Sequence, residues 1–447
     1  MAITLIILFL VIIFFLWHTR KFFYGRYILL FSSMWFASMI LMAFDVCQVN
    51  GILSSTMTII VSSTILYIGG YCLFRKKRFD NGYSYLVELD RRINRIFRSK
   101  FVILFYCAMI VILFYQFVQI LPLLLIEGNM GGGLRVDALL GNLYSPLFYT
   151  FNSYLFAPLY NITLPLSGYL IVTNKKWLAQ LLTAIYCILY PSLFGGRIAF
   201  FVFGLAVLVC YLLCKNSVYN YVRKDIKRLS YLLILFVVVL FSIMSIAKSG
   251  DVTNMKDSME ELSDDMLRQP LCYFVCPQKA FDYAIQNNYS SRMGGEMYGR
   301  ATFASIDYYV NPIINNLEGS HNPNANSIIG HIIQEEPISL SNDVPTWNAL
   351  YTALFHFYLD FGVIGCLIFS FMFGVLTRLT IILFLEKGSL ALFALSFFFI
   401  KNSMLSILSY QPVGGEVVPF LVYILLWVIY DKKFYGKQKQ RFFYRRA

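Results

Sequence analysis

Long apolar stretches separated by short polar connections run along most of the chain. Many of them extend over roughly 17 to 25 residues, enough for a helix to cross a hydrocarbon layer of about 30 Å. The first stretch lacks the charged start and the small-residue cleavage site of a signal peptide, so we expect it to remain as a helix. The pattern predicts an all-α polytopic membrane protein with about eleven transmembrane helices, at 2–17, 27–44, 52–74, 101–121, 148–172, 177–193, 198–214, 230–247, 361–384, 389–409 and 418–430.

One long polar segment interrupts this pattern. Residues 248–346 connect the eighth and ninth apolar stretches and are rich in Asn, Ser, Asp, Glu, Met and Tyr. We therefore predict three parts. Residues 1–247 hold transmembrane helices 1–8 with short loops, 248–346 form a large loop, and 347–447 hold a surface helix, three further spans and a basic tail. Because the loop contains helical patterns, we expect it to form a small, partly helical cap packed on the spans.

Spacing and prolines predict the elements of this cap. Apolar residues separated by four and three positions predict a helix over 255–268 with acidic residues on its other face. A proline suits the first position of a second helix, 277–286, and another proline is expected to end a third helix, 303–310. Residues 317–345 are predicted to be irregular, and 345–358 to form a short helix at the membrane surface.

Positive charge alternates from one connection to the next. Of the 37 Lys and Arg residues, 27 lie in alternate connections that begin with 18–26, 8 lie in the other connections, and Arg378 and Lys401 fall inside spans. Loops rich in Lys and Arg stay in the cytoplasm, so we expect the first set and the C-terminus there and 248–346 outside. The net charge of +13 therefore indicates topology in a lipid bilayer and does not indicate nucleic-acid binding.

Several catalytic signatures are absent from the sequence. It has no GxxxxGK[ST] phosphate loop, no GxSxG nucleophile turn, no HExxH zinc motif and no Asp-x-Asp pair. These absences disfavour ATP-driven transport, serine hydrolysis, zinc proteolysis and metal-dependent use of sugar nucleotides. A reaction outside the cytoplasm would then use a substrate that arrives already activated, and we expect no cofactor and no metal.

The nine cysteines do not form a metal motif. Most lie in or next to spans, where cysteine is usually a small apolar residue. Cys272 and Cys276 both lie in the large loop, but two cysteines four residues apart on one helix have poor disulfide geometry. His321 and His331 are distant from them without ligand-like spacing, so we expect no zinc site.

Glycine-flanked arginines are the clearest sign of a binding site outside the membrane. Arg197 follows two glycines at the start of the seventh span, Arg135 follows a run of glycines, and Arg292 and Arg300 flank the sequence GGEMYG. Glycine lets backbone approach a ligand closely, and guanidinium binds phosphate well. These residues therefore predict a site for a phosphate ester, with solvated arginines at the ends of spans as the simpler alternative.

Candidates for acid–base chemistry are Asp360, His321, His356, Glu416 and Asp307. Asp360 is unusual because it lies in WNALYTALFHFYLDFGVIG, an aromatic and aliphatic stretch that leads directly into a span. It could cap a helix at the membrane boundary. Alternatively, it is a carboxylate whose pKa is raised by apolar surroundings, or one that orients another group.

The same stretch carries a family resemblance. Asn348, Thr352, Tyr358, the sequence Asp360-Phe361-Gly362 and Gly365, together with the late outer loop and GGR at 195–197, resemble the Wzy-type oligosaccharide repeat-unit polymerases. The resemblance implies a bacterial inner-membrane glycosyltransferase that uses neither nucleotide nor metal. It would move a growing glycan from undecaprenyl diphosphate onto a new lipid-linked unit, beside a flippase and a chain-length regulator. The paired R-x10-G motif of some members is absent here, because no glycine lies eleven residues after Arg135, Arg197, Arg268, Arg292 or Arg300.

This resemblance and the residues together predict a cavity between the spans and the cap. Arg135, Arg197 and Arg300, with Arg292 nearby, would stabilise the leaving diphosphate, and Asp360 or His321 would take the acceptor's proton. Asn348, Tyr358 and Glu416 are expected to contact substrate, and Tyr298, Tyr308, Tyr309 and Trp347 to stack on sugars. Two alternatives stay open: a ligase that moves the glycan onto a lipid acceptor, and a flippase or other transporter without enzyme activity.

Overall fold

The computed structural model is helical throughout the residues it describes. These are 23–45, 47–49, 51–74, 84–126, 143–174, 176–194, 198–214, 257–335, 338–340, 347 and 350–444, with four positions between 10 and 17. In these ranges the only extended pairing is one isolated antiparallel bridge between Ile338 and Trp347. The prediction of an all-α protein is therefore confirmed for the described part of the chain.

Within that part, nine of the eleven predicted spans coincide in sequence with helices. Five of these helical segments are long and apolar enough to cross a membrane: α2 (Phe23–Ala43), α3 (Ser54–Cys72), α5 (Lys100–Ile126), the continuous segment Pro146–Thr173 and α16 (Ala353–Lys387). The segment Pro146–Thr173 consists of α7 (Pro146–Phe151), the π-helical turn η1 (Asn152–Phe156) and α8 (Ala157–Thr173). Shorter apolar stretches lie in α9 (Trp177–Ser192), α10 (Ile198–Cys214), α17 (Leu390–Leu405) and α18 (Val417–Tyr444). Predicted span 230–247 lies outside the described residues, as does most of 2–17.

Backbone contacts divide the chain into two compact units, each made of three stretches. The first consists of Met1–Lys77, Glu260–Leu379 and Phe399–Val418, and the second of Arg78–Met259, Thr380–Phe398 and Pro419–Ala447. The first unit therefore contains α2, α3, nearly all of the cap and most of α16. Every predicted site residue that the structure describes belongs to this unit.

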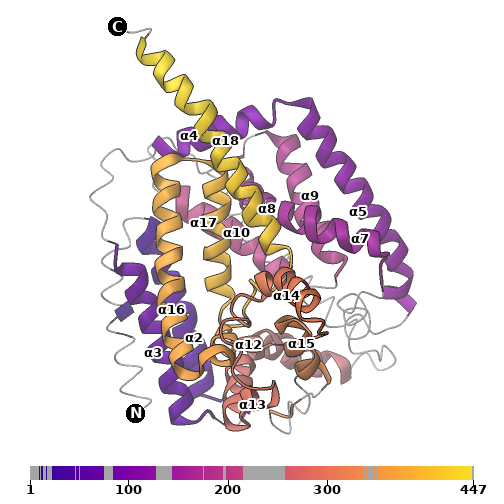
Figure 1. Cartoon of the computed structure of the whole chain (residues 1–447), viewed down its shortest axis with the longest axis vertical. Helices are drawn as coiled ribbons and strands as arrows, with labels where there is room; N and C mark the ends of the chain where they lie inside the picture. The colour runs from indigo at the N-terminus through magenta and orange to yellow at the C-terminus, as the bar shows by residue number, and fades with distance from the viewer. Residues whose placement is uncertain are drawn as a thin grey trace. The chain divides into compact units, whose positions relative to one another are not determined.

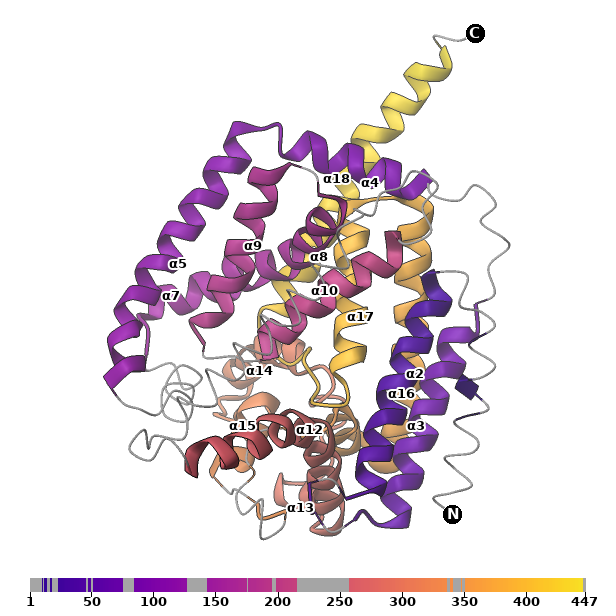
Figure 2. The same ribbon diagram turned by 180° about the vertical axis from the view of Figure 1, so that it is seen from behind.

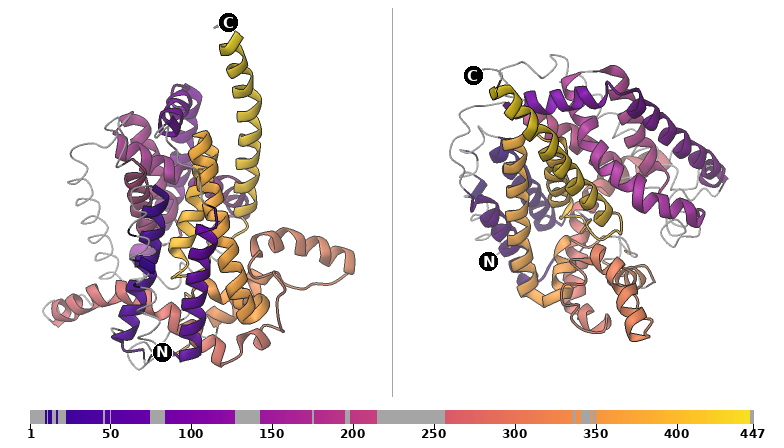
Figure 3. Two further views of the ribbon diagram at one scale, coloured as in Figure 1. Left: turned by 90° about the vertical axis from the view of Figure 1, so that its left-hand side faces the viewer. Right: turned by 45° about the horizontal axis from the view of Figure 1, so that its top comes forward.

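The cap contains α12 (Asp257–Gln286), α13 (Tyr289–Arg292), α14 (Ala304–Glu318) and α15 (Ala325–Glu335). Figure 3 shows the cap helices after α13 beside the first part of α16 (Ala353–Lys387). Three predictions for this segment are wrong. Helix α12 continues through Pro277 and α14 through Pro312, although each proline removes a backbone donor from the helix. Helix α15 occupies residues predicted to be irregular.

Tertiary packing and one helix N-cap residue explain why these three predictions are wrong. Next to Pro277, Cys276 and Gln278 are completely buried, so packing holds α12 together across the proline. Helix α15 begins after Asn324, whose side-chain oxygen accepts a hydrogen bond from the backbone N–H of Ser327 at 2.9 Å. This is an ordinary N-cap, and the buried side chains of Ala325 and Ile329 hold the helix in place.

Helix α16 unites the predicted surface helix and the ninth span. It begins at Ala353 and not at 345, but it is interrupted where the span was expected to start. Phe361 has φ −147° and ψ 32°, and Gly362 has φ 57° and ψ −142°, both outside helical values. The conformation of Gly362 is essentially restricted to glycine, so this residue permits the break directly after Asp360.

Helices α3 and α16 cross at very short range through two glycines. A Cβ atom added to Gly70 would lie 2.2 Å from the carbonyl oxygen of Phe371, and one added to Gly374 would lie 2.1 Å from that of Tyr67. Small residues allow such close approach between helices in membranes. Helix α2 lies alongside this pair (Figures 1 and 2), where Tyr27 hydrogen bonds to Tyr67 and Ser403, both at 2.6 Å.

The second unit has a similar construction around α8. A Cβ on Gly168 would lie 2.7 Å from the carbonyl oxygen of Ala206 in α10, so these two helices also pack closely. The Tyr106 hydroxyl of α5 is 2.8 Å from Thr163 Oγ1. At the basic connection, amphipathic α4 (Ser84–Ile96) places Arg92 in an ion pair with Asp431 of α18. No predicted site residue lies among these described contacts.

We predict that Gly70→Ala will destabilise the protein while Gly69→Ala will not. The added methyl group at position 70 would collide with backbone of α16 and separate the helices, at a cost of about 1–3 kcal/mol. The same methyl group at position 69 meets no atom within 4 Å. The melting temperature of detergent-solubilised protein, measured by loss of the monodisperse size-exclusion peak, should fall by several degrees only for Gly70→Ala, and equal values would contradict the close crossing.

Candidate functional site

Asp360 is the last residue of the part of α16 that precedes the break at Phe361 and Gly362, and it holds the cap there. Its side chain is completely buried, and Oδ1 accepts a hydrogen bond from the backbone N–H of Ala301 at 2.9 Å. Oδ2 accepts a second from Thr302 at 2.7 Å. The backbone carbonyls of Leu359 and Asp360 accept further bonds from the N–H groups of Met297 and Tyr298, at 2.9 and 3.3 Å. The segment 297–302 is thereby fixed to α16, and we call this arrangement the Asp360 clamp.

The clamp explains why a carboxylate lies in an apolar stretch. A carboxylate that accepts two backbone N–H groups makes charge-assisted hydrogen bonds, each stabilising the fold by about 1.5–3 kcal/mol. Each oxygen of Asp360 already has a donor, and the side chain has no exposed surface. This geometry favours a positioning role for Asp360 over direct proton transfer.

The clamped segment continues a glycine-rich turn that surrounds an open hollow. Gly294, Gly295 and Gly299 have φ angles of 89°, 112° and 94°, which glycine adopts without strain. A Cβ on either of the first two would meet no atom within 4 Å, so these glycines serve the backbone turn and not close packing. The hollow measures about 310 Å³ and is lined by Met293, Gly294, Gly295, Glu296, Met297, Tyr298, Arg300 and Ile328.

Arg300 enters this hollow already fixed by the cap. Its Nε donates to Asp307 Oδ1 at 2.9 Å, and its Nη2 donates to Asp307 Oδ2 at 3.4 Å and to the Pro323 carbonyl at 3.0 Å. Among the described residues, its bonds use Nε and Nη2, which leaves Nη1 for a ligand. Because Asp307 balances the charge, Arg300 supplies a positioned donor more than a net positive field. Its side chain is 39% exposed, enough for a ligand to reach it.

Helix α14, which carries Asp307, also contacts the turn before α18 that carries Glu416. The Tyr309 hydroxyl of α14 donates to the Gly415 carbonyl at 2.9 Å, and a Cβ on Gly415 would lie 3.0 Å from the Tyr308 ring. The next residue, Glu416, is half-buried. Burial raises the pKa of its carboxyl above the ordinary value, while its own backbone N–H and the charge of Lys401 act in the opposite direction.

Helix α14 therefore contacts both Arg300 and the turn that carries Glu416. Its residue Asp307 holds Arg300, and the next two residues, Tyr308 and Tyr309, contact the turn that carries Glu416. All of these contacts lie within the first compact unit. The structure thus brings a predicted phosphate-binding arginine and a predicted substrate-contacting carboxylate to one short stretch of one helix.

The remaining predicted residues are distributed around this centre. His321 is exposed in the connection 319–324, whose Pro323 accepts the bond from Arg300, and Arg292 is exposed over the Tyr289 ring at 5.2 Å. Tyr358 is half-buried and packs edge-on against the Phe281 ring, with centroids 6.0 Å apart. Arg135, Arg197 and Asn348 lie outside the described residues.

His356 is buried beside the Tyr410 ring, with centroids 5.3 Å apart. Separately, Lys401 of α17 interacts electrostatically with Glu416 of the turn before α18. The sequence indicated that Lys401 would face the protein interior, but it gave no indication that Glu416 would be its electrostatic partner. Asp307 appeared in the sequence as an acid–base candidate, and the structure shows it as the partner of Arg300.

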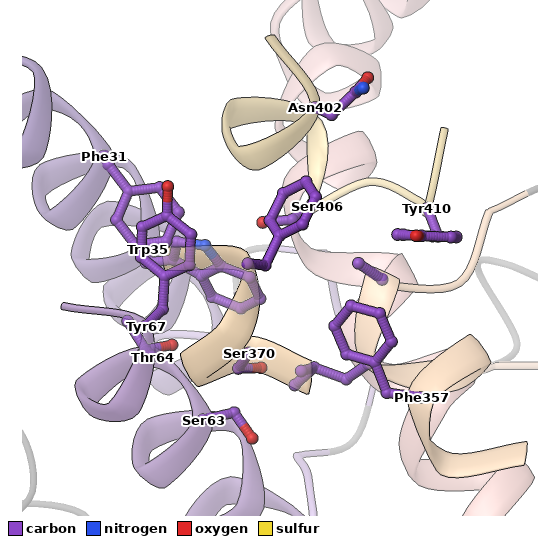
Figure 4. A pocket seen from close by; sticks show the side chains of 13 residues that line it. Phe31, Trp35, Ser63, Thr64, Tyr67, Phe357, Ser370, Asn402, Ser406 and Tyr410 are labelled. Carbon is purple, nitrogen blue, oxygen red and sulfur yellow. The ribbon is translucent and has the colours of Figure 1, made fainter. Parts of the chain in front are cut away.

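A small cavity, lined mainly by aromatic and aliphatic side chains with a few polar ones, lies deeper between the helices (Figure 4). Trp35 of α2, Ser63 of α3 and Asn402 of α17 are among the residues that line it, and the cavity measures about 30 Å³. Among the described residues, the Trp35 Nε1, the Ser63 hydroxyl and both amide atoms of Asn402 have no hydrogen-bond partner. A space of this size admits about two water molecules and no sugar or phosphate, so it is not the substrate site.

Comparisons of the chain with protein-family models, with curated proteins and with solved structures find no match. The resemblance in residues 347–365 therefore stays a prediction.

We predict that Asp360→Asn will loosen the clamped segment. The amide keeps the shape of the side chain but places an N–H₂ group against a backbone N–H, so at least one bond is lost. Amide hydrogen exchange in a peptide covering 297–303 should become about 10- to 100-fold faster, the value expected for one charge-assisted bond. Peptides from the second half of α14 serve as the internal control. Unchanged exchange at 297–303 would show that the carboxylate does not hold this segment.

Proposed function

We propose that this protein polymerises lipid-linked oligosaccharide repeat units at the outer face of a bacterial inner membrane. A hydroxyl at the non-reducing end of the acceptor unit attacks C1 of the first sugar of the donor glycan. The bond from C1 to the diphosphate oxygen breaks, undecaprenyl diphosphate leaves, and the hydroxyl proton passes to a base. The donor carries its own activation, so the step needs neither a nucleotide nor a gradient.

The proposed topology has eleven spans, a cytoplasmic C-terminus and the cap 248–346 in the periplasm. In the part of the chain that the structure describes, five membrane-length helical segments and four shorter apolar helices support it, as does the alternation of Lys and Arg in the sequence. In this arrangement the cap lies where a lipid diphosphate presents its headgroup. A flippase and a chain-length regulator would be the partners, as the resemblance implies.

The observation that carries the proposal is that residues 307–309 of α14 contact both Arg300 and the glycine that directly precedes Glu416. Glycosyl transfer from a diphosphate needs a cationic donor at the leaving group and a base at the acceptor hydroxyl. A hollow of about 310 Å³ beside Arg300 falls in the range of small-ligand sites. Tyr298, 74% exposed on the rim of this hollow, offers an aromatic face to a sugar ring.

Within this proposal, Glu416 is the base. The sequence placed Asp360 and His321 first for that role, but Asp360 is buried and bonded at each oxygen, and His321 is exposed on the cap. Glu416 is half-buried, and burial raises the pKa of its carboxyl toward the range in which a general base is most effective. Arg135 and Arg197 complete the diphosphate site in the proposal, on the strength of their glycine-flanked positions in the sequence.

Purified protein in liposomes with a lipid-linked repeat unit tests the function directly. We expect a ladder of lipid-linked products to form without nucleotide, seen by gel electrophoresis and mass spectrometry. If the protein is a ligase, a single transfer to an added lipid acceptor will occur and no ladder will form. If it is a flippase, units will cross the bilayer without any new glycosidic bond. Either result would refute polymerisation.

We predict that Glu416→Gln will lower the initial rate of ladder formation at least about 100-fold, the usual contribution of a general base. Glu318→Gln, an exposed change at the end of α14, is the matched control and should keep the wild-type rate. The wild-type rate should fall at low pH because the base must be ionised. The midpoint of this fall should lie above the pKa of a free glutamate, since burial raises that of Glu416. Full activity in Glu416→Gln would exclude this residue as the base.

A further inference from the structure

A disulfide joins the connection between α2 and α3 to the cap. Cys47 is bonded to Cys272 of α12, their Cα atoms are 5.6 Å apart, and 225 positions separate them in the sequence. Cys47 is completely buried, and Cys276, one turn further along α12 from Cys272, is also buried and takes no part in this disulfide. The pairing of Cys272 with Cys276, which helix geometry disfavours, does not occur.

The bond is the first of several contacts along the same face of α12. Two residues beyond Cys272, the Phe274 carbonyl accepts a hydrogen bond from the Ser38 hydroxyl of α2 at 2.5 Å. The Gln278 amide donates to that same hydroxyl. Ser38 and Gln278 are both buried, so this contact belongs to the interior of the first unit. Helix α12 is therefore docked on α2 independently of the sulfur atoms.

The contacts continue onto the start of α3. Asp282 is completely buried, and its Oδ1 accepts hydrogen bonds from the Thr56 hydroxyl at 2.6 Å and from the Leu53 N–H at 3.3 Å. Lys279 donates to the Gly51 carbonyl at 2.6 Å and pairs with Asp282 at 3.3 Å. The α2–α3 connection and residues 272–282 thus form one polar seam, and the two cysteines lie at its end.

We propose that Cys47 and Cys272 are oxidised after export, and that their bond fixes both the α2–α3 connection and α12 on the oxidising side of the membrane. The two thiols lose two protons and two electrons, which pass to the disulfide of an exoplasmic thiol–disulfide oxidoreductase that leaves as a dithiol. Disulfides persist in such compartments and are rare in the cytosol. The seam holds the two cysteines together, so exchange yields this pair and leaves Cys276 reduced.

Placing the α2–α3 connection outside determines in which direction α2 and α3 cross the membrane. Helix α3 has 19 residues, a length of about 28 Å at 1.5 Å per residue, and its first residue follows the disulfide-bonded connection. If that connection is outside, Cys72 at the other end of α3 is on the cytoplasmic side. Cys72 is exposed and free, so it serves as a built-in reporter of the opposite face. The proposal does not depend on which reaction the protein catalyses.

The first experiment is peptide mapping of the full-length protein, alkylated and digested without reduction. We expect a linked peptide pair containing Cys47 and Cys272, and we expect it to disappear when the protein is produced in cells that cannot form exoplasmic disulfides. Two separate alkylated peptides from wild-type cells would overturn the proposal. The result does not require any variant to fold.

The second experiment locates the thiols with a membrane-impermeant maleimide on spheroplasts. In Cys47→Ser, the released Cys272 should be labelled before permeabilisation and Cys72 only afterwards; Cys47→Ser/Cys272→Ser is the control that loses the first signal. Wild-type protein should show the first signal only after reduction. If Cys272 requires permeabilisation, or Cys72 does not, the assigned sides are wrong. If single variants fail to accumulate, labelling of reduced wild-type protein decides between the same outcomes.

Discussion

A buried carboxylate between two backbone N–H groups holds the cap to the membrane helices. Asp360 lies at the last helical position before Gly362 interrupts α16, so the carboxylate and the break occur at one point of the chain. The apolar surroundings make this charge costly unless both oxygens are bonded. These bonds fix residues 297–302, and therefore the backbone of Arg300, whose side chain lines the hollow.

From this clamp, a short series of contacts reaches every described group to which we assign chemistry. Arg300 directly precedes the two clamped N–H groups, and Asp307 holds its guanidinium. Tyr308 and Tyr309 then contact the turn that positions Glu416. The charges in this region are paired locally: Arg300 with Asp307, and Glu416 with Lys401. A substrate phosphate would therefore enter a site whose side chains are already oriented.

The sequence predicted the membrane helices better than the cap. A helix in a bilayer is specified by the length and composition of an apolar run, and both can be read from one sequence. Helix boundaries in the cap depend on tertiary packing, which lets α12 and α14 continue through Pro277 and Pro312. Asn324 is a residue type that commonly serves as an N-cap, so the start of α15 had a signal in the sequence. The surrounding Asn, Pro, Gly and Ser residues nevertheless indicated a loop.

The candidate site shows the same division. Asp360 and Gly362 could be singled out because a charge and a glycine are unexpected at the start of a span. The partners of Asp360 could not, because they are backbone N–H groups without a side-chain signature. The pairing of Arg300 with Asp307 and of Cys47 with Cys272 also depends on how the chain turns, which spacing alone does not reveal.

Photo-crosslinking with a polyprenyl diphosphate that carries a photoreactive group beside the phosphates would test the location of the site most directly. Adducts are expected in peptides covering 293–302 and 411–416, and unlabelled lipid-linked repeat unit should suppress them. Adducts confined to α5 and α8–α10, or adducts that the competitor leaves unchanged, would contradict the assignment of the diphosphate site to the clamped segment.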